Sequence, residues 1–342
     1  MSASLRPFGG DARELLDLLE PWLREGGEPV VIRTSGSTGE PKDVVLSHAA
    51  VTASARATHE RLGGPGQWLL ALPTTGVAAL QVLVRSIMAG ERPVLADEHG
   101  SLEAALRSMD GARRYASLVP TQLHRLAEAG DLGLLAGLDA LLVGGAATSP
   151  RLLARAREAG VTIVRTYGMS ETSGGCVYDG LPLDGVRWRI GPEGRIQLAG
   201  ATLFDGYADP EATARVLREG WLSTDDLGEA DDDGRLRVLG RGDDVVVSGG
   251  VNIPLPAVTE ALRGVDGVRD VQAVGVRDDE WGTRVVACIV GDVALDVLRD
   301  AVSSAGLPRT WAPRGVVRLA TLPLLPGGKV DRRALRALAA SS

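Results

Sequence analysis

The sequence predicts an α/β protein with two domains: a large N-terminal domain of mainly parallel sheets flanked by helices, with an added β subdomain, and a small mobile α+β C-terminal domain. Short apolar runs alternate with helical patterns between residues 67 and 168, which is typical of βαβ units. From about residue 186, short strands are instead separated by Gly-rich turns. A chain of 342 residues is also long enough for two domains. We place the domains at 1–242 and 243–342, with the β subdomain at about 186–240.

The N-terminal elements follow from their patterns in order. A short helix is expected over 11–24, "PVVIR" reads as a buried strand, and Ser47 is a plausible N-cap for a helix that ends near residue 62. Strands then alternate with helices, the strands at 67–73, 92–96, 115–120, 138–145 and 161–168, and the helices at 77–89, 102–109, from 121, and 149–160. Sites in parallel sheets open beyond the C-terminal ends of the strands. Three loops that leave strand ends therefore matter most: 34–42, 144–148 and 167–172.

The C-terminal part has shorter elements. The β subdomain is expected to hold strands at 186–190, 194–200 and 234–240. After residue 250 we expect a helix near 256–263, strands near 268–277 and 283–290, a helix near 294–305, and a last helix after Asp331. This stretch is large enough for a small α+β domain.

Composition excludes several functional classes. The net charge of −7 argues against a nucleic-acid-binding surface, which needs a basic face. The two cysteines form no metal-binding motif and suit a reducing cytoplasm. The most apolar run, "GVAALQVLVRSIMAG", is too short for a membrane span and contains Arg85.

The strongest local signal is "TSGSTGEPK" at 34–42. Its glycines let the backbone approach an anion, and the hydroxyl and amide groups of Ser35, Ser37 and Thr38 can donate to phosphate oxygens. Lys42 adds a mobile positive charge. Asp43 follows Lys42 where a Walker A motif needs Ser or Thr, so the phosphate must be held differently.

Three further motifs carry weaker signals. In "TYGMSET", Glu171 could ligate Mg²⁺ and Tyr167 offers a flat face to a base, although a capped turn would also explain the motif. In "WLSTDD", Asp225 or Asp226 could accept the two hydroxyls of a ribose, although a solvated acidic turn is the simpler interpretation. "GRGDD", at the predicted domain junction, could form a linker that rotates.

The helix at 77–89 carries two polar residues on one apolar face. Gln81 and Arg85 are four residues apart. A cation here could hold a second carboxylate of a substrate, which indicates a dicarboxylic acid activated at one end. The alternative is a surface stripe with Arg85 in water.

Taken in order, "TSGSTGEPK", "YGMSET", "WLSTDD", "GRGDD" and "PGGKVDRR" resemble the adenylate-forming superfamily of acyl- and aryl-CoA ligases, luciferases and peptide-synthetase adenylation domains. The resemblance implies ATP, Mg²⁺ and coenzyme A as cofactors and co-substrates. It implies that Lys329, one of only two lysines in the chain, is the catalytic residue that bridges the carboxylate and the α-phosphate. A compact ammonium suits that task better than a guanidinium.

The resemblance also assigns the remaining site residues. Glu171 becomes the Mg²⁺ ligand, Asp226 and Arg241 the ribose contacts, and Asp243 the hinge that later brings the region of Ser248–Gly250 toward the thioester-forming site. The other ATP-binding residues that it implies are Thr34, Ser35, Gly36, Ser37, Thr38, Gly39, Lys42, Gly144, Gly145, Ala146, Tyr167, Gly168, Met169, Ser170 and Thr172.

The chain departs from the superfamily pattern in three places. Thr224-Asp225-Asp226 replaces the usual Thr-Gly-Asp, so either aspartate could contact the ribose, with Asp226 preferred by alignment. Gly76 stands where many members carry a histidine near the acyl pocket. Only 33 residues precede the phosphate loop, so an N-terminal subdomain is expected to be largely missing. A homodimer is one way to supply the lost contacts.

The expected substrate follows from a narrower resemblance. The short form with "LQVLVRS" after the acyl loop resembles the o-succinylbenzoate–CoA ligases of menaquinone biosynthesis, which implies that Arg85, with Gln81 and Gly76 nearby, binds an aromatic dicarboxylate. The alternatives are another aryl- or acyl-CoA ligase, a stand-alone adenylation enzyme, or a nucleotide-binding protein without ligase activity.

Overall fold

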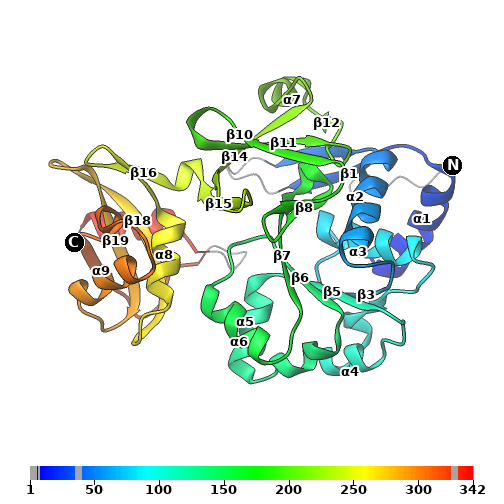
Figure 1. Cartoon of the computed structure of the whole chain (residues 1–342), viewed down its shortest axis with the longest axis horizontal. Coiled ribbons are helices and arrows are strands. Elements are labelled where there is room, and N and C mark those ends of the chain that lie inside the picture. Colours follow the sequence, from blue (N-terminus) through cyan, green and yellow to red (C-terminus); the bar gives the residue numbers. More distant parts are fainter. Residues whose placement is uncertain (1–5, 7, 35–40, 325–329, 342) are drawn as a thin grey trace. The chain divides into compact units, whose positions relative to one another are not determined.

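The chain forms two compact units (Figure 1). The structure, a computed structural model, describes residues 6, 8–34, 41–324 and 330–341. Unit 1 comprises Met1–Arg189, Gln197–Thr224 and Ala230–Leu236, and unit 2 comprises Ile190–Ile196, Asp225–Glu229 and Arg237–Ser342. The predicted boundary after residue 242 stays a prediction.

A seven-stranded sheet with the order β4-β3-β5-β6-β7-β8-β9 forms the centre of unit 1 (Figure 1). Its first five strands are parallel, and β8 and β9 are antiparallel. This confirms the predicted βαβ pattern. The strands are β3 (Gln67–Leu70), β4 (Val94–Leu95), β5 (Arg114–Leu118), β6 (Ala140–Val143), β7 (Ile163–Met169), β8 (Gly174–Tyr178) and β9 (Leu181–Pro182).

Helices cover both faces of this sheet because its strands carry apolar residues on both sides. Side chains of α4, α5 and α6 pack on the face that includes Leu69, Ala116 and Leu141. Trp68 points to the opposite face, where α3 lies. The helical segments are α3 (Val77–Met88), η1 (Ala96–Glu98), α4 (Leu102–Arg107), α5 (Pro120–Ala129), η2 (Leu132–Gly137), α6 (Pro150–Glu158) and η3 (Ser170–Thr172).

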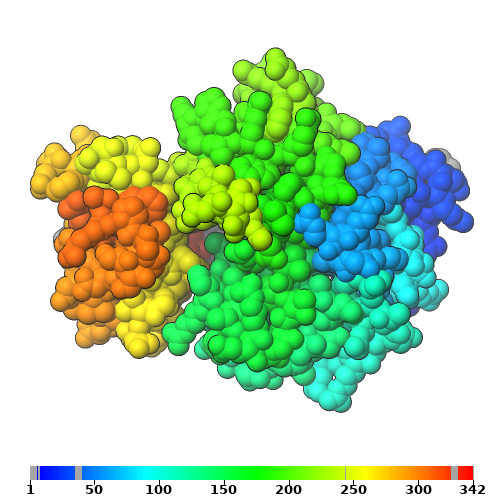
Figure 2. Space-filling model, viewed as in Figure 1, coloured from blue at the N-terminus to red at the C-terminus, as the bar shows by residue number. Residues whose placement is uncertain are grey.

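The N-terminal segment adds two helices and a hairpin. Asp11 caps α1 (Ala12–Glu25), and Ser47 caps α2 (His48–Arg61) through a bond from the Ala50 amide, as predicted. The two helices lie side by side at the surface, blue in Figure 2. The Trp22 ring of α1 packs edge to face on the His48 ring of α2, with centroids 5.0 Å apart. In the chain segment between α1 and α2, β1 (Val30–Thr34) pairs antiparallel with β2 (Lys42–Leu46). The sequence did not predict β2.

Antiparallel strands follow, as expected for the β subdomain. They form a sheet of order β10-β11-β14-β13, with β15 paired to β14. The short β12 (Gly206–Tyr207) instead pairs with β2, next to α7 (Pro210–Val216). The other bounds are β10 (Val186–Ile190), η4 (Pro192–Gly194), β11 (Arg195–Gly200), β13 (Leu217–Arg218), β14 (Trp221–Ala230) and β15 (Leu236–Arg241).

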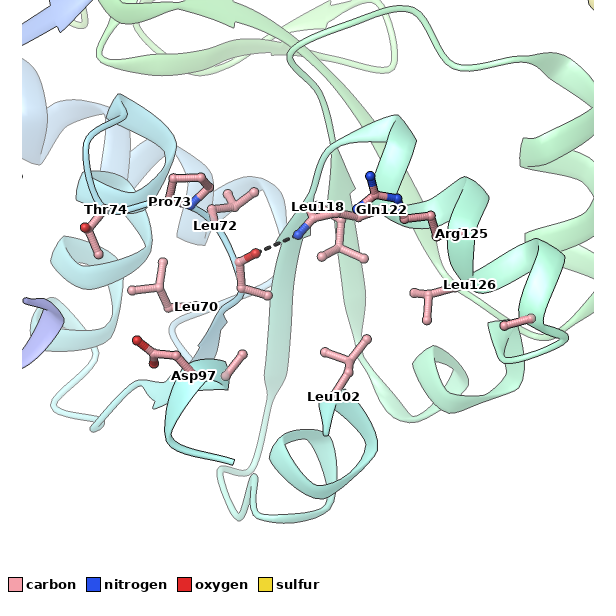
Figure 3. A pocket seen from close by; sticks show the side chains of 13 residues that line it. Leu70, Leu72, Pro73, Thr74, Asp97, Leu102, Leu118, Gln122, Arg125 and Leu126 are labelled. Carbon is pink, nitrogen blue, oxygen red and sulfur yellow. Dashed lines mark hydrogen bonds between the residues drawn. The ribbon is translucent and has the colours of Figure 1, made fainter. Parts of the chain in front are cut away.

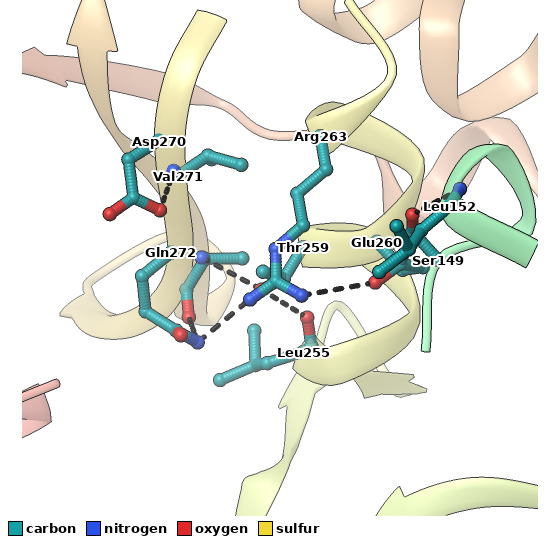
Figure 4. A network of polar contacts seen from close by, with 10 residues as sticks. Ser149, Leu152, Leu255, Thr259, Glu260, Arg263, Asp270, Val271 and Gln272 are labelled. Atoms are coloured by element: carbon teal, nitrogen blue, oxygen red, sulfur yellow. Dashed lines mark hydrogen bonds and ion pairs between the residues drawn. The ribbon is translucent and has the colours of Figure 1, made fainter. Parts of the chain in front are cut away.

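Unit 2 has its own core, built on the antiparallel β18–β19 pair and the parallel strand β20. The buried Thr259 of α8 ties helix to sheet, since its hydroxyl oxygen accepts the amide of Ala273 at 2.9 Å (Figure 4). The elements are η5 (Gly242–Asp244), β16 (Val245–Ser248), β17 (Val251–Pro254), α8 (Leu255–Arg263), β18 (Val268–Asp278), β19 (Gly282–Gly291), α9 (Leu295–Ser304), η6 (Arg309–Trp311), β20 (Gly315–Arg318) and α10 (Arg332–Ala340).

Among the described residues, no helix combines the length and the apolar character needed to cross a membrane. The mixed α/β fold is as the sequence predicts.

Candidate functional site

The predicted phosphate loop is carried by the β1–β2 hairpin. Thr34 and Lys42 face each other at the open end of the hairpin, and the Thr34 hydroxyl donates to the Lys42 carbonyl at 3.2 Å. Arg33 and Asp43 form the next cross-strand pair, with guanidinium–carboxylate distances of 2.8 and 3.0 Å. Hydrogen bonding from Arg33 lowers the pKa of Asp43. Asp43 thus stabilises the hairpin through its ion pair with Arg33, and Lys42 lies at the strand end next to the loop.

Ser35, Gly36, Ser37, Thr38 and Gly39 lie outside the described residues, and so does Lys329 of the C-terminal motif. Their roles remain predictions.

Glu171 lies in η3, a 3₁₀ helix of one turn that directly follows β7. The turn is closed by the buried Thr172, whose hydroxyl oxygen accepts the Met169 amide at 2.9 Å and donates to the Gly174 carbonyl at 2.6 Å. The capped turn that the motif also predicts is therefore present. The hydroxyl of Thr172 is used inside the turn, whereas the Glu171 side chain is only half-buried.

Tyr207 connects the two charged residues, and sequence reasoning missed it. Its hydroxyl donates to Glu171 Oε1 at 2.7 Å, and its ring centroid lies 5.1 Å from Lys42 Nζ. Only the long-range pairing of β12 with β2 brings residue 207 to this place, so no local pattern could have identified it. The predicted phosphate cation and the predicted metal ligand thus belong to one cluster, which we call the charged cluster: Lys42, Glu171 and Tyr207.

The charged cluster fits a magnesium–nucleotide complex. No group of three or more His, Cys, Asp or Glu side chains suited to a metal occurs in the described part of the chain. Mg²⁺ does not need such a cage, because it commonly takes one or two carboxylates together with substrate phosphates and water. Glu171 Oε2 makes no hydrogen bond to another described residue, so one carboxylate oxygen is available as a ligand.

The two loops expected to form the adenine slot leave adjacent strands. Gly144–Ala146 follow β6, and Tyr167–Met169 end β7, its parallel neighbour. Close packing explains two of the glycines. A Cβ on Gly144 would lie 2.2 Å from Thr166 Oγ1, and one on Gly168 would lie 2.1 Å from the Gly174 carbonyl oxygen. The structure therefore brings these two loops to the same edge of the sheet as η3, which carries Ser170.

Arg85 is buried at 3% exposure, so the interpretation as a solvent-exposed stripe is wrong. Its guanidinium lies over the Trp68 ring, 4.9 Å from the centroid, and donates to Tyr178 Oη at 3.4 Å. Tyr178 is held in turn by Thr58, 3.0 Å away. Burial lowers the pKa of Arg85, but an arginine stays protonated in a protein. We call Arg85, Trp68, Tyr178, Thr58 and the adjacent His59 the buried cluster.

The buried cluster contains a charge without a counterion. Within the described residues Arg85 makes no ion pair, and its Nε has no hydrogen-bond partner. His59 cannot balance the charge. Its burial, aided by the positive charge of Arg85, lowers its pKa to about 4, and its Nε2 also lacks a partner. An unpaired buried charge costs several kcal/mol, so the arrangement favours an incoming anion.

Gln81 and Gly76 lie on the same helix as Arg85. Gln81 is buried, donates to the Val51 carbonyl at 3.2 Å, and leaves its own Oε1 without a partner in the described structure. Gly76 is the N-cap of α3, and a Cβ placed there would meet only the Pro73 carbonyl, at 4.0 Å. The space beside Gly76 is therefore open.

A cavity of about 690 Å³ lies beyond the ends of β3 and β5 (Figure 3). Leu70, Leu72, Leu102, Leu118 and Leu126 make its lining mostly apolar, and Gln122 fixes one wall by donating to the Ala71 carbonyl at 2.7 Å. None of the predicted site residues lines it. The loop that ends in Gly76 forms its edge, so the cavity is a neighbour of the predicted acyl region rather than part of it.

The predicted ribose residues belong to unit 2. Asp225 accepts from Arg195 at 3.0 Å and from Arg241 at 3.2 Å. Asp226, the next residue on β14, points to the opposite face of the strand. The preference for Asp226 as the ribose contact stays a prediction. Asp243 lies in η5, and its side chain is outside the described part.

Comparison with known proteins identifies the family. The model of the AMP-binding enzyme family matches residues 23–207, and that of the AMP-binding enzyme C-terminal domain matches 257–329. A probable 2-succinylbenzoate–CoA ligase of Mycobacterium tuberculosis is 48% identical over 320 residues, which cover 90% of this chain and 83% of that protein. A 2-succinylbenzoate–CoA ligase of Bacillus cereus is 32% identical, with 90% and 69% covered.

Solved structures agree with these matches. The o-succinylbenzoate CoA synthetase of Bacillus subtilis in complex with the acyl-adenylate intermediate OSB-AMP superimposes with a TM-score of 0.78 at 27% identity, covering 90% of this chain and 68% of that one. The predicted superfamily is confirmed: the chain belongs to the AMP-binding enzyme family.

Proposed function

We propose that this protein is an AMP-forming acid–CoA ligase that converts o-succinylbenzoate, ATP and coenzyme A into o-succinylbenzoyl-CoA, AMP and pyrophosphate in menaquinone biosynthesis. The relatives named as 2-succinylbenzoate–CoA ligases support this reaction. Structures of the Bacillus subtilis synthetase with OSB-AMP and with ATP and magnesium support the acyl-adenylate and Mg·ATP.

The observation that carries the choice of acid is the buried Arg85, which has no counterion among the residues that the structure describes. o-Succinylbenzoate has two carboxylates, one on a flexible succinyl arm and one on the ring. The succinyl carboxylate is the one to be activated, so the aromatic carboxylate is free to neutralise a buried guanidinium. A charge-assisted pair of this kind is strong in a site without water.

The chemistry has two steps. An oxygen of the succinyl carboxylate bonds to the α-phosphorus of ATP, and the bond from that phosphorus to the pyrophosphate oxygen breaks. The sulfur of coenzyme A then bonds to the acyl carbon, the thiol proton is lost, and AMP leaves. No side-chain nucleophile is required, so positioning and charge stabilisation carry the rate.

The chain's residues divide this work. Lys42 and the phosphate loop would hold the β- and γ-phosphates, and Glu171 would hold Mg²⁺, which when bound would neutralise charge on the phosphates. Lys329 stabilises the charge that develops at the α-phosphate. The loops at 144–146 and 167–170 border the adenine, and Thr172 shapes its turn. The same proposal includes ribose binding by Asp226 and Arg241, a hinge at Asp243 and domains at 1–242 and 243–342. It also includes a homodimer and a cytoplasmic location.

ATP–pyrophosphate exchange with a panel of acids tests the proposal. We expect exchange with o-succinylbenzoate and, after addition of coenzyme A, the thioester by mass spectrometry. Exchange with a monocarboxylic acid but not with o-succinylbenzoate would favour a different ligase or an adenylation enzyme. Mg·ATP binding with no exchange on any acid would indicate a nucleotide-binding protein without ligase activity.

A further inference from the structure

The segment Phe204–Tyr207 holds Glu171 from two directions. The Phe204 amide donates to the backbone carbonyl of Glu171 at 2.9 Å, and the Tyr207 hydroxyl donates to its side chain at 2.7 Å. The Phe204 ring packs edge to face on the Tyr207 ring, with centroids 5.0 Å apart. Backbone and carboxylate of one residue are therefore fixed by the same short segment.

Strand register explains why Tyr207 also reaches Lys42. Tyr207 lies directly opposite Val44 in the antiparallel β12–β2 pair, so both side chains point to the same face. Lys42 is two residues before Val44 on β2 and shares that face. Diagonal neighbours in such a pair are within reach of long side chains, and the ammonium indeed lies 5.1 Å from the ring centroid.

The backbone around Tyr207 is itself fixed. The Tyr207 amide donates to Thr213 Oγ1 at 2.8 Å, and the Ala208 amide donates to the Asp43 carbonyl at 2.9 Å. Gly206 has φ +149° and lies so close to Thr213 that a Cβ would be 2.9 Å from its side chain. Tyr207 thus has a rigid base from which to orient other groups.

We propose that Tyr207 is a positioning residue of the ATP site: its hydroxyl orients the Glu171 carboxylate for Mg²⁺, and its ring orients the Lys42 ammonium for the phosphates. The hydroxyl donates to Oε1, and Oε2, which makes no hydrogen bond to another described residue, is left for the metal. Metal-binding carboxylates are commonly held by such hydrogen bonds, and losing one typically costs 10- to 100-fold in metal affinity or activity. The inference rests on the proposed Mg·ATP chemistry but not on the identity of the acid.

The two contacts can be separated by substitution. Tyr207→Phe removes the hydroxyl and keeps the ring, whereas Tyr207→Leu removes both. We expect Tyr207→Phe to weaken Mg·ATP binding about tenfold in calorimetry without any acid present. It should also raise the Mg²⁺ concentration needed for half-maximal exchange, with the KM for the acid unchanged. Tyr207→Leu should weaken binding severalfold further.

A double-mutant cycle distinguishes orientation of Glu171 from a general structural role. In a Glu171→Ala background, Tyr207→Phe should have no further effect on Mg·ATP binding, because the carboxylate that accepts the hydroxyl is gone. Likewise, Tyr207→Leu and Tyr207→Phe should bind alike in a Lys42→Ala background. The proposal is overturned if Tyr207→Phe binds Mg·ATP like the parent, or if its effect is equally large beside Glu171→Ala. Because the binding measurement uses no acid, a wrong substrate assignment would leave its result unchanged.

Discussion

The charged cluster and the buried cluster hold their cations in opposite ways. Lys42 is half-buried and shares Tyr207 with a carboxylate, so both signs of charge are already placed and oriented. Arg85 is buried among Trp68, Tyr178 and Thr58, with no acidic side chain in the described structure to balance it. The difference suggests a division of labour. We therefore expect the charged cluster to be formed before Mg·ATP binds, and the buried cluster to gain its counterion only when the acid binds.

The largest expected effect concerns neither cluster. If both clusters only bind and orient, a third group must stabilise the transition state, and our candidate is Lys329. Lys329→Ala should lower the exchange rate by roughly 10²–10³-fold, the typical cost of one such electrostatic group. The equilibrium dissociation constants for Mg·ATP and for o-succinylbenzoate should change by less than about twofold. Comparable exchange rates for parent and variant would remove Lys329 from the chemistry.

The buried charge of Arg85 should lower the free energy of unfolding of the ligand-free protein. Replacing Arg85 by Met removes an uncompensated buried charge and leaves Tyr178 its partner Thr58. We therefore expect Arg85→Met to raise the free energy of unfolding by about 1–3 kcal/mol in urea titration. The matched control is Arg56→Met on the exposed face of α2, which should stay within about 0.5 kcal/mol of the parent. A strongly destabilised Arg85→Met would mean that Arg85 already has a compensating partner.

His59 should make the buried cluster sensitive to acid. Its pKa is about 4 in the folded chain and 6.5 in the unfolded chain, so near pH 5 only the unfolded chain binds the proton. Stability is then full above pH 6.5 and falls as the pH drops through about 4, with a loss of about 2 kcal/mol at pH 5. His59→Gln should flatten this part of the stability profile. An unchanged profile would show that His59 is protonated in the folded protein.

Substitutions in the charged cluster should have the smallest effect, because we expect several groups to contact the phosphates of ATP together. Lys42→Ala should raise the KM for Mg·ATP about tenfold, the value of one charge-assisted contact, and leave the KM for the acid unchanged. Lys42→Arg tests whether charge alone suffices. Arginine occupies 35 of the chain's 37 Lys or Arg positions, so poor rescue by Arg would indicate a steric demand for the smaller ammonium. Full activity of Lys42→Ala would exclude Lys42 from the ATP site.

The sequence predicted the parts of the fold with strong periodicity. Strands β3, β5, β6 and β7 are apolar runs between helical patterns, and these were recognised. The short strand β2 and the two-residue β12 were missed, because each exists through pairing with a distant segment. The antiparallel β8 was missed as well.

The same reason limits prediction of the site. Glu171 and Lys42 belong to contiguous motifs and were found from them, whereas Tyr207 reaches both only through the β12–β2 pairing. The helical spacing between Gln81 and Arg85 predicts that the two share a face, but Trp68 and Tyr178, which enclose Arg85, come from other elements. Local patterns thus identified the charges, and tertiary contacts identified what orients them.

We expect Arg85 to select an acid with a second carboxylate. Pyrophosphate exchange with o-succinylbenzoate and with 4-oxo-4-phenylbutanoate, which lacks the aromatic carboxylate, measures that selection as a ratio of kcat/KM. We predict a ratio of about 10² for the parent, the scale expected when a buried charge keeps or loses its partner, and a ratio near one for Arg85→Met. Equal ratios in the two proteins would show that Arg85 does not recognise the aromatic carboxylate.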